Sequence, residues 1–147
     1  MKYILTCITA IIFVLCTQAQ SKNIMDEDVP TVIRSQFMKT HPTAVEVGWK
    51  QFNTDYIVEY TQNTFTSFAL YTKEGHLVET KDKITTFAMP STAYDYIKEN
   101  YGNVPLKEFF KSVNAASGLV TYSAKVKNQE VVFDNKGSYI KTVDFIL

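Results

Sequence analysis

A rough tandem duplication in this 147-residue chain constrains its fold more than any single residue does. Each copy opens with an apolar residue and a proline, Val29-Pro30 in the first and Met89-Pro90 in the second. A helix-like run, several strand-like runs and a turn closed by glycine then follow in the same order. We therefore divide the chain into a leader at 1–19, a polar segment at 20–28, a first repeat at 29–86 and a second repeat at 87–147.

Each copy is expected to begin with one helix. The first should run from Pro30 to Thr40, with Ile33 and Phe37 on one face, and His41-Pro42 should end it, because a residue before proline is pushed out of the helical region. The second should run from Pro90 to Tyr101, with Gly102 as its cap.

Alternating apolar residues predict the strands that follow each helix. Val45, Val47 and Trp49, for example, alternate with polar residues or glycine and predict a half-buried strand. The turns are expected at Gly75 and Gly137. Strands are expected at 45–50, 56–60, 65–71 and 77–84 in the first repeat, and at 106–113, 119–126, 130–133 and 139–146 in the second.

The predicted fold class is α+β, with two tandem repeats that each pack one helix on an antiparallel sheet of about four strands. A single helix can cover only one face of such a sheet. Each repeat should therefore leave a sheet face partly open, while the sequence leaves undecided whether the two sheets join.

The first nineteen residues have the layout of a secretory signal, with Lys2 followed by an apolar run to Cys16. That run is too short for a membrane span, which needs about 20 apolar residues. Small residues at Thr17 and Ala19 favour cleavage before Gln20, which predicts a periplasmic or secreted protein. The rival hypothesis is a lipid anchor on Cys16, against which Leu15 stands where a small residue is preferred.

Composition argues against nucleic acid as a partner. Removal of Lys2 from the fifteen basic residues leaves fourteen against fifteen acidic ones, without a basic stripe. Both cysteines, Cys7 and Cys16, lie in the leader, so the exported domain would depend on its apolar core alone.

Acidic residues gather at Asp26, Glu27 and Asp28, before the first helix. Negative charge is favourable near the positive end of a helix dipole. A calcium site is the sharper alternative, but the alternating spacing and the glycine of a calcium loop are missing. We expect no metal and no cofactor.

The sequence offers few side chains that could act in catalysis, so we expect no enzyme activity and assign no catalytic residue. Only His41 and His76 could act as imidazole bases, and neither lies in a nucleophile or metal-ligand motif. His41 is expected at the end of a helix, and His76 on a strand facing water.

Large aromatic side chains in the predicted strands are the candidate protein-binding residues, because such side chains dominate interfaces. Each of them could instead fill the core beneath a helix. Together they exceed what two short helices can cover, so one or two are expected on the open face. The candidates are Trp49, Tyr56, Tyr60, Tyr71 and Tyr122.

The chain resembles the exported PepSY-like proteins related to the beta-lactamase inhibitory protein, which are commonly built of two tandem repeats. The resemblance covers nearly all of the chain after the leader and rests on packing and turn motifs. Those motifs are Val29-Pro30, His41-Pro42, Val45, Val47, Trp49, the alternation from Tyr56 to Tyr60, Gly75, Met89-Pro90, Tyr101 and Phe133-Asp134-Asn135-Lys136-Gly137.

The resemblance implies a protein outside the cytoplasm, without a cofactor, that binds or inhibits another protein. In the beta-lactamase inhibitory protein the tandem sheets form a concave surface that grips an enzyme, and PepSY domains accompany peptidases as inhibitory segments. The resulting hypothesis is a non-catalytic module that binds an unidentified protein or peptide through an open sheet face. The alternatives are a small-ligand carrier with a pocket between helix and sheet, and a structural component of the cell envelope. The oligomeric state is left open.

Overall fold

The computed structural model describes residues 21–102 and 104–147. The expected leader at 1–19, with the Cys16 alternative, lies outside these residues. The described chain consists of two similar halves, and a short strand and a single-turn helix open the first of them. The first half contains β1 (Lys22–Ile24), η1 (Asp26–Asp28), α1 (Thr31–Thr40), β2 (Val45–Phe52), β3 (Asp55–Gln62), β4 (Phe65–Tyr71) and β5 (Leu77–Ile84). The second contains η2 (Thr86–Ala88), α2 (Ser91–Tyr101), β6 (Phe109–Asn114), β7 (Val120–Val126), β8 (Gln129–Phe133) and β9 (Tyr139–Asp144).

All strands of the described residues belong to one antiparallel sheet, in which each strand pairs with the next from β1 to β9. Strands β5 and β6 join the two halves, with register pairs that run from Glu79 opposite Asn114 to Ile84 opposite Phe109. The two repeats therefore share one continuous sheet, which decides the question that the sequence left open. The observed α+β class, with two helices on an open antiparallel sheet, is the predicted one.

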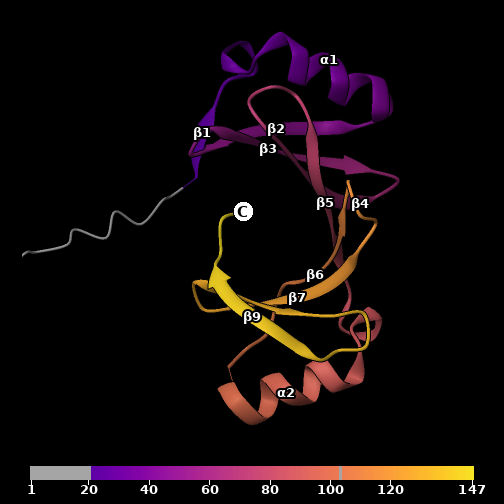
Figure 1. Ribbon diagram of the computed structural model, residues 1–147, viewed down its shortest axis with the longest axis vertical. Coiled ribbons are helices and arrows are strands. Elements are labelled where there is room, and N and C mark those ends of the chain that lie inside the picture. Colours follow the sequence, from indigo (N-terminus) through magenta and orange to yellow (C-terminus); the bar gives the residue numbers. More distant parts are fainter. Residues whose placement is uncertain (1–20, 103) are drawn as a thin grey trace, which may run out of the picture.

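Figure 1 shows the sheet curving like a letter C, with α1 and α2 outside its two ends. Both helices lie on the same sheet face. Residues of the first core, such as Ala69 of β4, lie beside Thr80 of β5, which in turn lies beside Val113 of β6. Neighbouring residues in register point to the same face of a sheet, so this chain of pairs links the two helix-bearing surfaces. We call the opposite, inward-curving surface the concave face.

Each helix begins immediately after its proline, as the sequence predicts. Pro30 and Pro90 cap α1 and α2, and their carbonyl oxygens accept the first helical hydrogen bonds. The first helix ends at His41, whose N–H donates to the Phe37 carbonyl, and the second ends at Gly102 with a φ of 64°. A positive φ of this kind favours glycine.

A separate apolar core lies under each helix. In the first repeat Ile33 and Phe37 of α1 face the sheet, and in the second Ala93 and Ile97 of α2 do so. The first core comprises Val29, Ile33, Phe37, Trp49, Val58, Tyr60, Ala69 and Tyr71. The second comprises Met89, Ala93, Ile97, Phe109, Ala124, Val126, Val131 and Phe133.

The polar segment before α1 has regular structure of its own, a strand followed by a single-turn helix. Lys22–Ile24 pairs with β2, and Asp26 accepts hydrogen bonds from the Trp49 indole at 3.1 Å and from Arg34 at 2.9 Å. Asp26 therefore ties the segment to the first core.

The expected burial of Val45 and Val47 is wrong. Strand β2 contains an irregularity between Val45 and Gly48, with Glu46 at a φ of 53°, and both valines are exposed. An extra residue shifts the alternation of a strand, so a period of two no longer predicts which side chains face the core. Trp49, beyond the irregularity, is buried as expected.

The two glycine turns have the same backbone geometry. In the first, Thr72 N–H donates to the His76 carbonyl and Gly75 N–H to the Thr72 carbonyl, and Asp134, Gly137 and Ser138 repeat this pattern in the second. Gly75 and Gly137 have φ values of 89° and 88°, which accounts for glycine at both places.

Candidate functional site

Along each strand, side chains point alternately to the helix-bearing face and to the concave face. The residues that alternate with the core residues therefore form the concave face. In β3, for example, Ile57 and Glu59 point away from the core formed by Val58 and Tyr60. Neither helix covers this face in Figure 1. Its side chains are a mixture of charged and apolar groups, which include Lys50, Glu59, Lys81, Lys125, Glu130, Val132, Lys141 and Val143.

A third apolar cluster occupies the centre of this face. Ile57, Phe68 and Phe110 are buried there, and they come from β3, β4 and β6. The cluster therefore bridges the two repeats on the side opposite the helices.

Residues 145–147 cover this cluster, although the sequence predicted that the last strand would continue to 146. Strand β9 ends at Asp144, and Phe145, Ile146 and Leu147 then pack against the cluster. The end of the chain lies inside the curve of the sheet in Figure 1. The Phe145 ring lies 5.8 Å from the Phe110 ring and 4.1 Å from Lys125 Nζ, a cation–π arrangement.

An ion pair is buried beside the cluster. Lys81 Nζ on β5 donates to the two carboxylate oxygens of Glu130 on β8, at 2.7 and 3.0 Å. Ser123 on β7 also donates to Glu130. The pair spans β6 and β7 on the concave face, and each buried charge has the other as its partner.

A groove of about 420 Å³ continues from this ion pair to the far end of the concave face. Lys81 and Glu130 lie along it, together with Ile146 of the covering segment. Its wall also carries apolar side chains that are open to solvent, namely Leu119 at 60 %, Ile140 at 46 % and Val143 at 37 % exposure.

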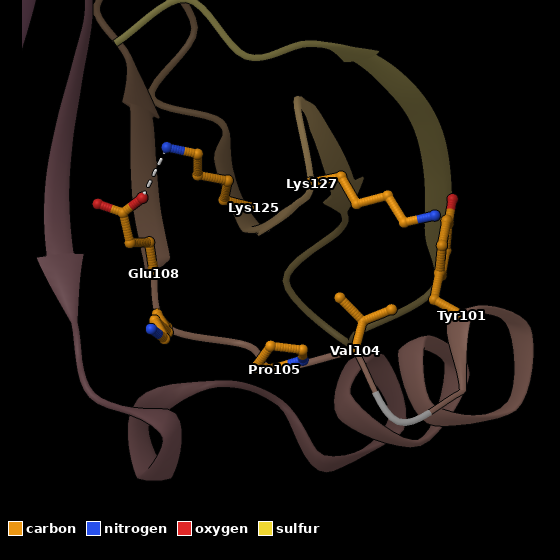
Figure 2. A pocket seen from close by; sticks show the side chains of 7 residues that line it. Tyr101, Val104, Pro105, Glu108, Lys125 and Lys127 are labelled. Atoms are coloured by element: carbon orange, nitrogen blue, oxygen red, sulfur yellow. Dashed lines mark ion pairs between the residues drawn. The ribbon is translucent and has the colours of Figure 1, made fainter.

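A second hollow, of about 740 Å³, lies where α2 gives way to the loop before β6. Figure 2 shows Val104 and Pro105 beside it, with Tyr101 and Lys127 on one side and Glu108 and Lys125 on the other. Lys107 also lines it.

Two lysines form ion pairs with Glu108, the acidic residue that lines this hollow. Glu108 accepts a hydrogen bond from Lys125 at 2.9 Å and one from Lys83 at 3.3 Å. The Lys125 hydrogen bond is the main cause that keeps the pKa of Glu108 below its ordinary value. Glu108 is therefore a poor proton donor at neutral pH.

The structure brings the five candidate aromatic residues to the helix-bearing face, not to the concave face. Trp49, Tyr60 and Tyr71 are buried in the first core, Tyr56 is half-buried against it, and Tyr122 is half-buried against the second core. The expectation that one or two of them would lie on the open face is not met. A direct binding role for these side chains stays a prediction; their described contacts are packing contacts and the hydrogen bond from the Trp49 indole to Asp26.

The sequence missed the residues that do form the concave face. Tyr56, Ile57, Val58 and Tyr60 put large side chains on both sides of β3, so alternation did not show that Ile57 lies on the concave face. In the sequence, Phe145 and Ile146 continue the last strand-like run, so the pattern places them at the end of the strand predicted at 139–146. Lys81 and Glu130 are 49 positions apart, and no local signal pairs them.

The histidines lie apart from each other in packing and turn positions. His41 ends α1 as predicted, with its ring stacked on Phe37 at 5.1 Å and its Nδ1 2.8 Å from Thr40 Oγ1. Burial lowers the pKa of His41, so its imidazole is neutral at pH 7. His76 is exposed to solvent as expected, but it lies in the turn just before β5 and not on a strand.

Tyr60 is equally unsuited to acid–base chemistry. Burial, together with the Asp82 charge, raises the pKa of its phenol to about 12. Within 21–102 and 104–147 no three His, Cys, Asp or Glu side chains are grouped in a way that could hold a metal ion. No helix of the described chain is long and apolar enough to cross a membrane.

Solved structures show what this arrangement is similar to, although no protein-family model and no curated protein matches the chain. A protein from Bacteroides eggerthii that is described as periplasmic superposes with a TM-score of 0.64 at 15% identity, and the match covers 79% of this chain and 88% of that one. A DUF2874 family protein from Bacteroides uniformis gives a TM-score of 0.63 at 16% identity, over 78% and 88%. A BLIP-like protein from Bacteroides fragilis gives 0.60 at 13% identity, over 80% and 87%. The chain has the BLIP-like fold.

This match confirms the resemblance to proteins like the beta-lactamase inhibitory protein that the tandem prolines and glycine turns indicated. At these identities the likeness concerns the fold. In this chain both helices lie on one face of the sheet and the concave face is free of them (Figure 1).

Proposed function

We propose that this chain is an exported, non-catalytic module that binds a protein partner on the concave face of its sheet. The observation that carries the proposal is the exposed apolar wall of the groove on that face, formed by Leu119, Ile140 and Val143. Apolar side chains gathered on a curved surface and surrounded by charges are typical of protein-binding sites.

The fold and its relatives support this proposal. A solved structure with the same fold is described as BLIP-like, and another as periplasmic, in agreement with export after cleavage near Gln20. We infer that binding inhibits the partner, which would be an extracytoplasmic enzyme such as a peptidase. The buried ion pair of Lys81 and Glu130 supports binding by holding the concave face in one curvature before the partner arrives.

The test is affinity capture from an envelope extract with the tagged chain after leader removal. A variant with Ile140→Asp and Val143→Asp puts charge on the groove wall, and Met38→Asp puts the same charge on the exposed side of α1 as a matched control. A protein captured by the parent chain and by the Met38 variant, but lost with the groove variant, is the expected result.

Folding has to be checked in each variant by circular dichroism. If the groove variant is folded and captures the same protein as the parent chain, the concave face is not the binding surface. For a captured enzyme, inhibition is tested directly by titrating its activity with the purified chain. Unchanged activity at saturation would limit the function to binding.

The hollow in Figure 2 favours a second candidate function, the small-ligand carrier. Its apolar part, Val104 and Pro105, adjoins the ammonium groups of Lys107 and Lys127, which suits an apolar ligand with one carboxylate. Calorimetric titration with decanoate, beside decanol as the neutral control, tests it. Binding of decanoate that weakens in a Lys107→Ala and Lys127→Ala variant would support the carrier, and absence of heat from either compound would eliminate it.

A further inference from the structure

We propose that the partner anchors itself by an aromatic residue followed by aliphatic residues, and that this segment takes the place of the chain's own Phe145, Ile146 and Leu147 on the concave face. The inference rests on the proposed binding function and names the chemistry that the surface accepts. Its central observation is that residues 145–147 already occupy the apolar cluster of Ile57, Phe68 and Phe110.

The position of Phe145 defines an aromatic slot. The centre of its ring lies 5.8 Å from the centre of the Phe110 ring and 4.1 Å from Lys125 Nζ. An aromatic ring gains from both neighbours, since it contacts another ring and a cation at the same time. An aliphatic side chain in the same place would keep only the apolar contact.

The covering segment is held in a way that allows exchange. Besides its side-chain contacts, the segment makes one described backbone hydrogen bond outside the sheet pairing. In it, Phe145 N–H donates to the Asn128 carbonyl at 3.0 Å. All three residues remain half-buried, and a partly open void of about 30 Å³ is lined by Ile146 and Leu147 of the segment and by Ile57 and Phe68 of the cluster. An imperfect fit of this kind leaves contact energy for a better-shaped segment.

The slot also continues into the groove of the proposed site. Ile146 lines both the void and the groove, where Ile140 and Val143 are exposed. A partner segment anchored in the slot would therefore extend past the position of Ile146 along the groove wall formed by Ile140 and Val143. The covering segment then acts as an internal competitor that reduces the apparent affinity by the fraction of time it stays in place.

A labelled peptide with the sequence of residues 142–147 tests this inference by fluorescence anisotropy, without the natural partner. It is titrated into the intact chain and into a chain shortened by residues 145–147. If the segment covers the slot for four fifths of the time or more, the peptide should bind the shortened chain about fivefold more tightly or better. A peptide with alanine in place of the phenylalanine should bind about tenfold more weakly.

A full-length variant with Phe145→Ala and Ile146→Ala loosens the segment without shortening the chain, and it replaces the shortened chain if that chain does not fold. Equal binding of the two peptides, or no binding to either altered chain, would overturn the inference. Dimerisation of the altered chain in sedimentation, without peptide binding, would overturn it in favour of a second copy as the occupant.

Failure of the inference is distinguishable from failure of the proposed function. If the peptides do not bind but the groove variant still loses its captured partner, the concave face binds by other contacts. If neither experiment succeeds, both the anchor and the binding function are rejected.

Discussion

Removing one member of the buried ion pair should destabilise the chain far more than removing an exposed lysine. The side chains of Lys81 and Glu130 are 11% and 6% exposed, and their closest atoms are 2.7 Å apart. In a Lys81→Met variant the Glu130 carboxylate would stay buried with Ser123 as its remaining described donor. Breaking a buried pair in this way costs about 3 to 5 kcal/mol of unfolding free energy.

The measurement is chemical denaturation of the parent chain and its variants, with the unfolding free energy extrapolated to water. The melting temperature should fall by about 10 to 20 °C for a domain of this size. Lys83→Met is the matched control, because Lys83 pairs with Glu108 at 3.3 Å with 43% and 30% of the two side chains exposed. That change should cost at most about 1 kcal/mol.

The double variant with Lys81→Met and Glu130→Leu separates pairing from packing. Replacing both charges by apolar groups should recover most of the loss, because neither buried charge is then left alone. The difference between the double variant and the sum of the single variants gives the coupling energy. If Lys81→Met costs less than about 1 kcal/mol, or if the double variant is as unstable as the sum of the two single variants, the reasoning is refuted.

Two further predictions concern the second glycine turn. Gly137→Ala should cost about 1 to 3 kcal/mol more unfolding free energy than Gly75→Ala, although both glycines have positive φ. An added methyl at Gly137 would overlap the Thr92 hydroxyl and lie 2.8 Å from the backbone nitrogen of Ala93, whereas at Gly75 the nearest atom is a Val32 methyl at 3.1 Å; thermal unfolding compares the two variants, and equal losses would contradict the prediction. Asp134→Asn should lower the melting temperature at pH 7, because hydrogen bonds from backbone N–H groups, Ser138 first, hold the pKa of Asp134 below its ordinary 3.8. The stabilisation is present above 3.8 and is lost as the pH falls through the folded pKa, so the difference between the two chains should shrink steadily in melts below pH 3.8; a difference that does not change with pH would contradict this account.

The repeated architecture could be predicted from the sequence because its signals are local. A proline before each helix fixes where the helix begins, and a turn that needs a positive φ requires glycine at Gly75 and Gly137. These residues act through their own backbone conformation. Their effect therefore does not depend on what lies across the sheet.

The candidate site was harder to predict because it depends on contacts between distant strands. Trp49 and Tyr60 are the residue types that often form interfaces, but the curvature of the sheet and the position of α1 enclose them. Lys22–Ile24 has little hydrophobicity, and it is a strand only because β2 offers it backbone partners. Tertiary context of this kind overrides local propensity.

The pairing of β5 with β6 also changes how many strand edges the chain presents to other molecules. Two separate sheets would have four edge strands, and every edge strand offers unpaired N–H and C=O groups on which another chain can add. In the described sheet the edges are β1, which has three residues, and β9, which has six. Joining the repeats thus protects the chain against aggregation, and β9 is the longer edge on which such addition would begin.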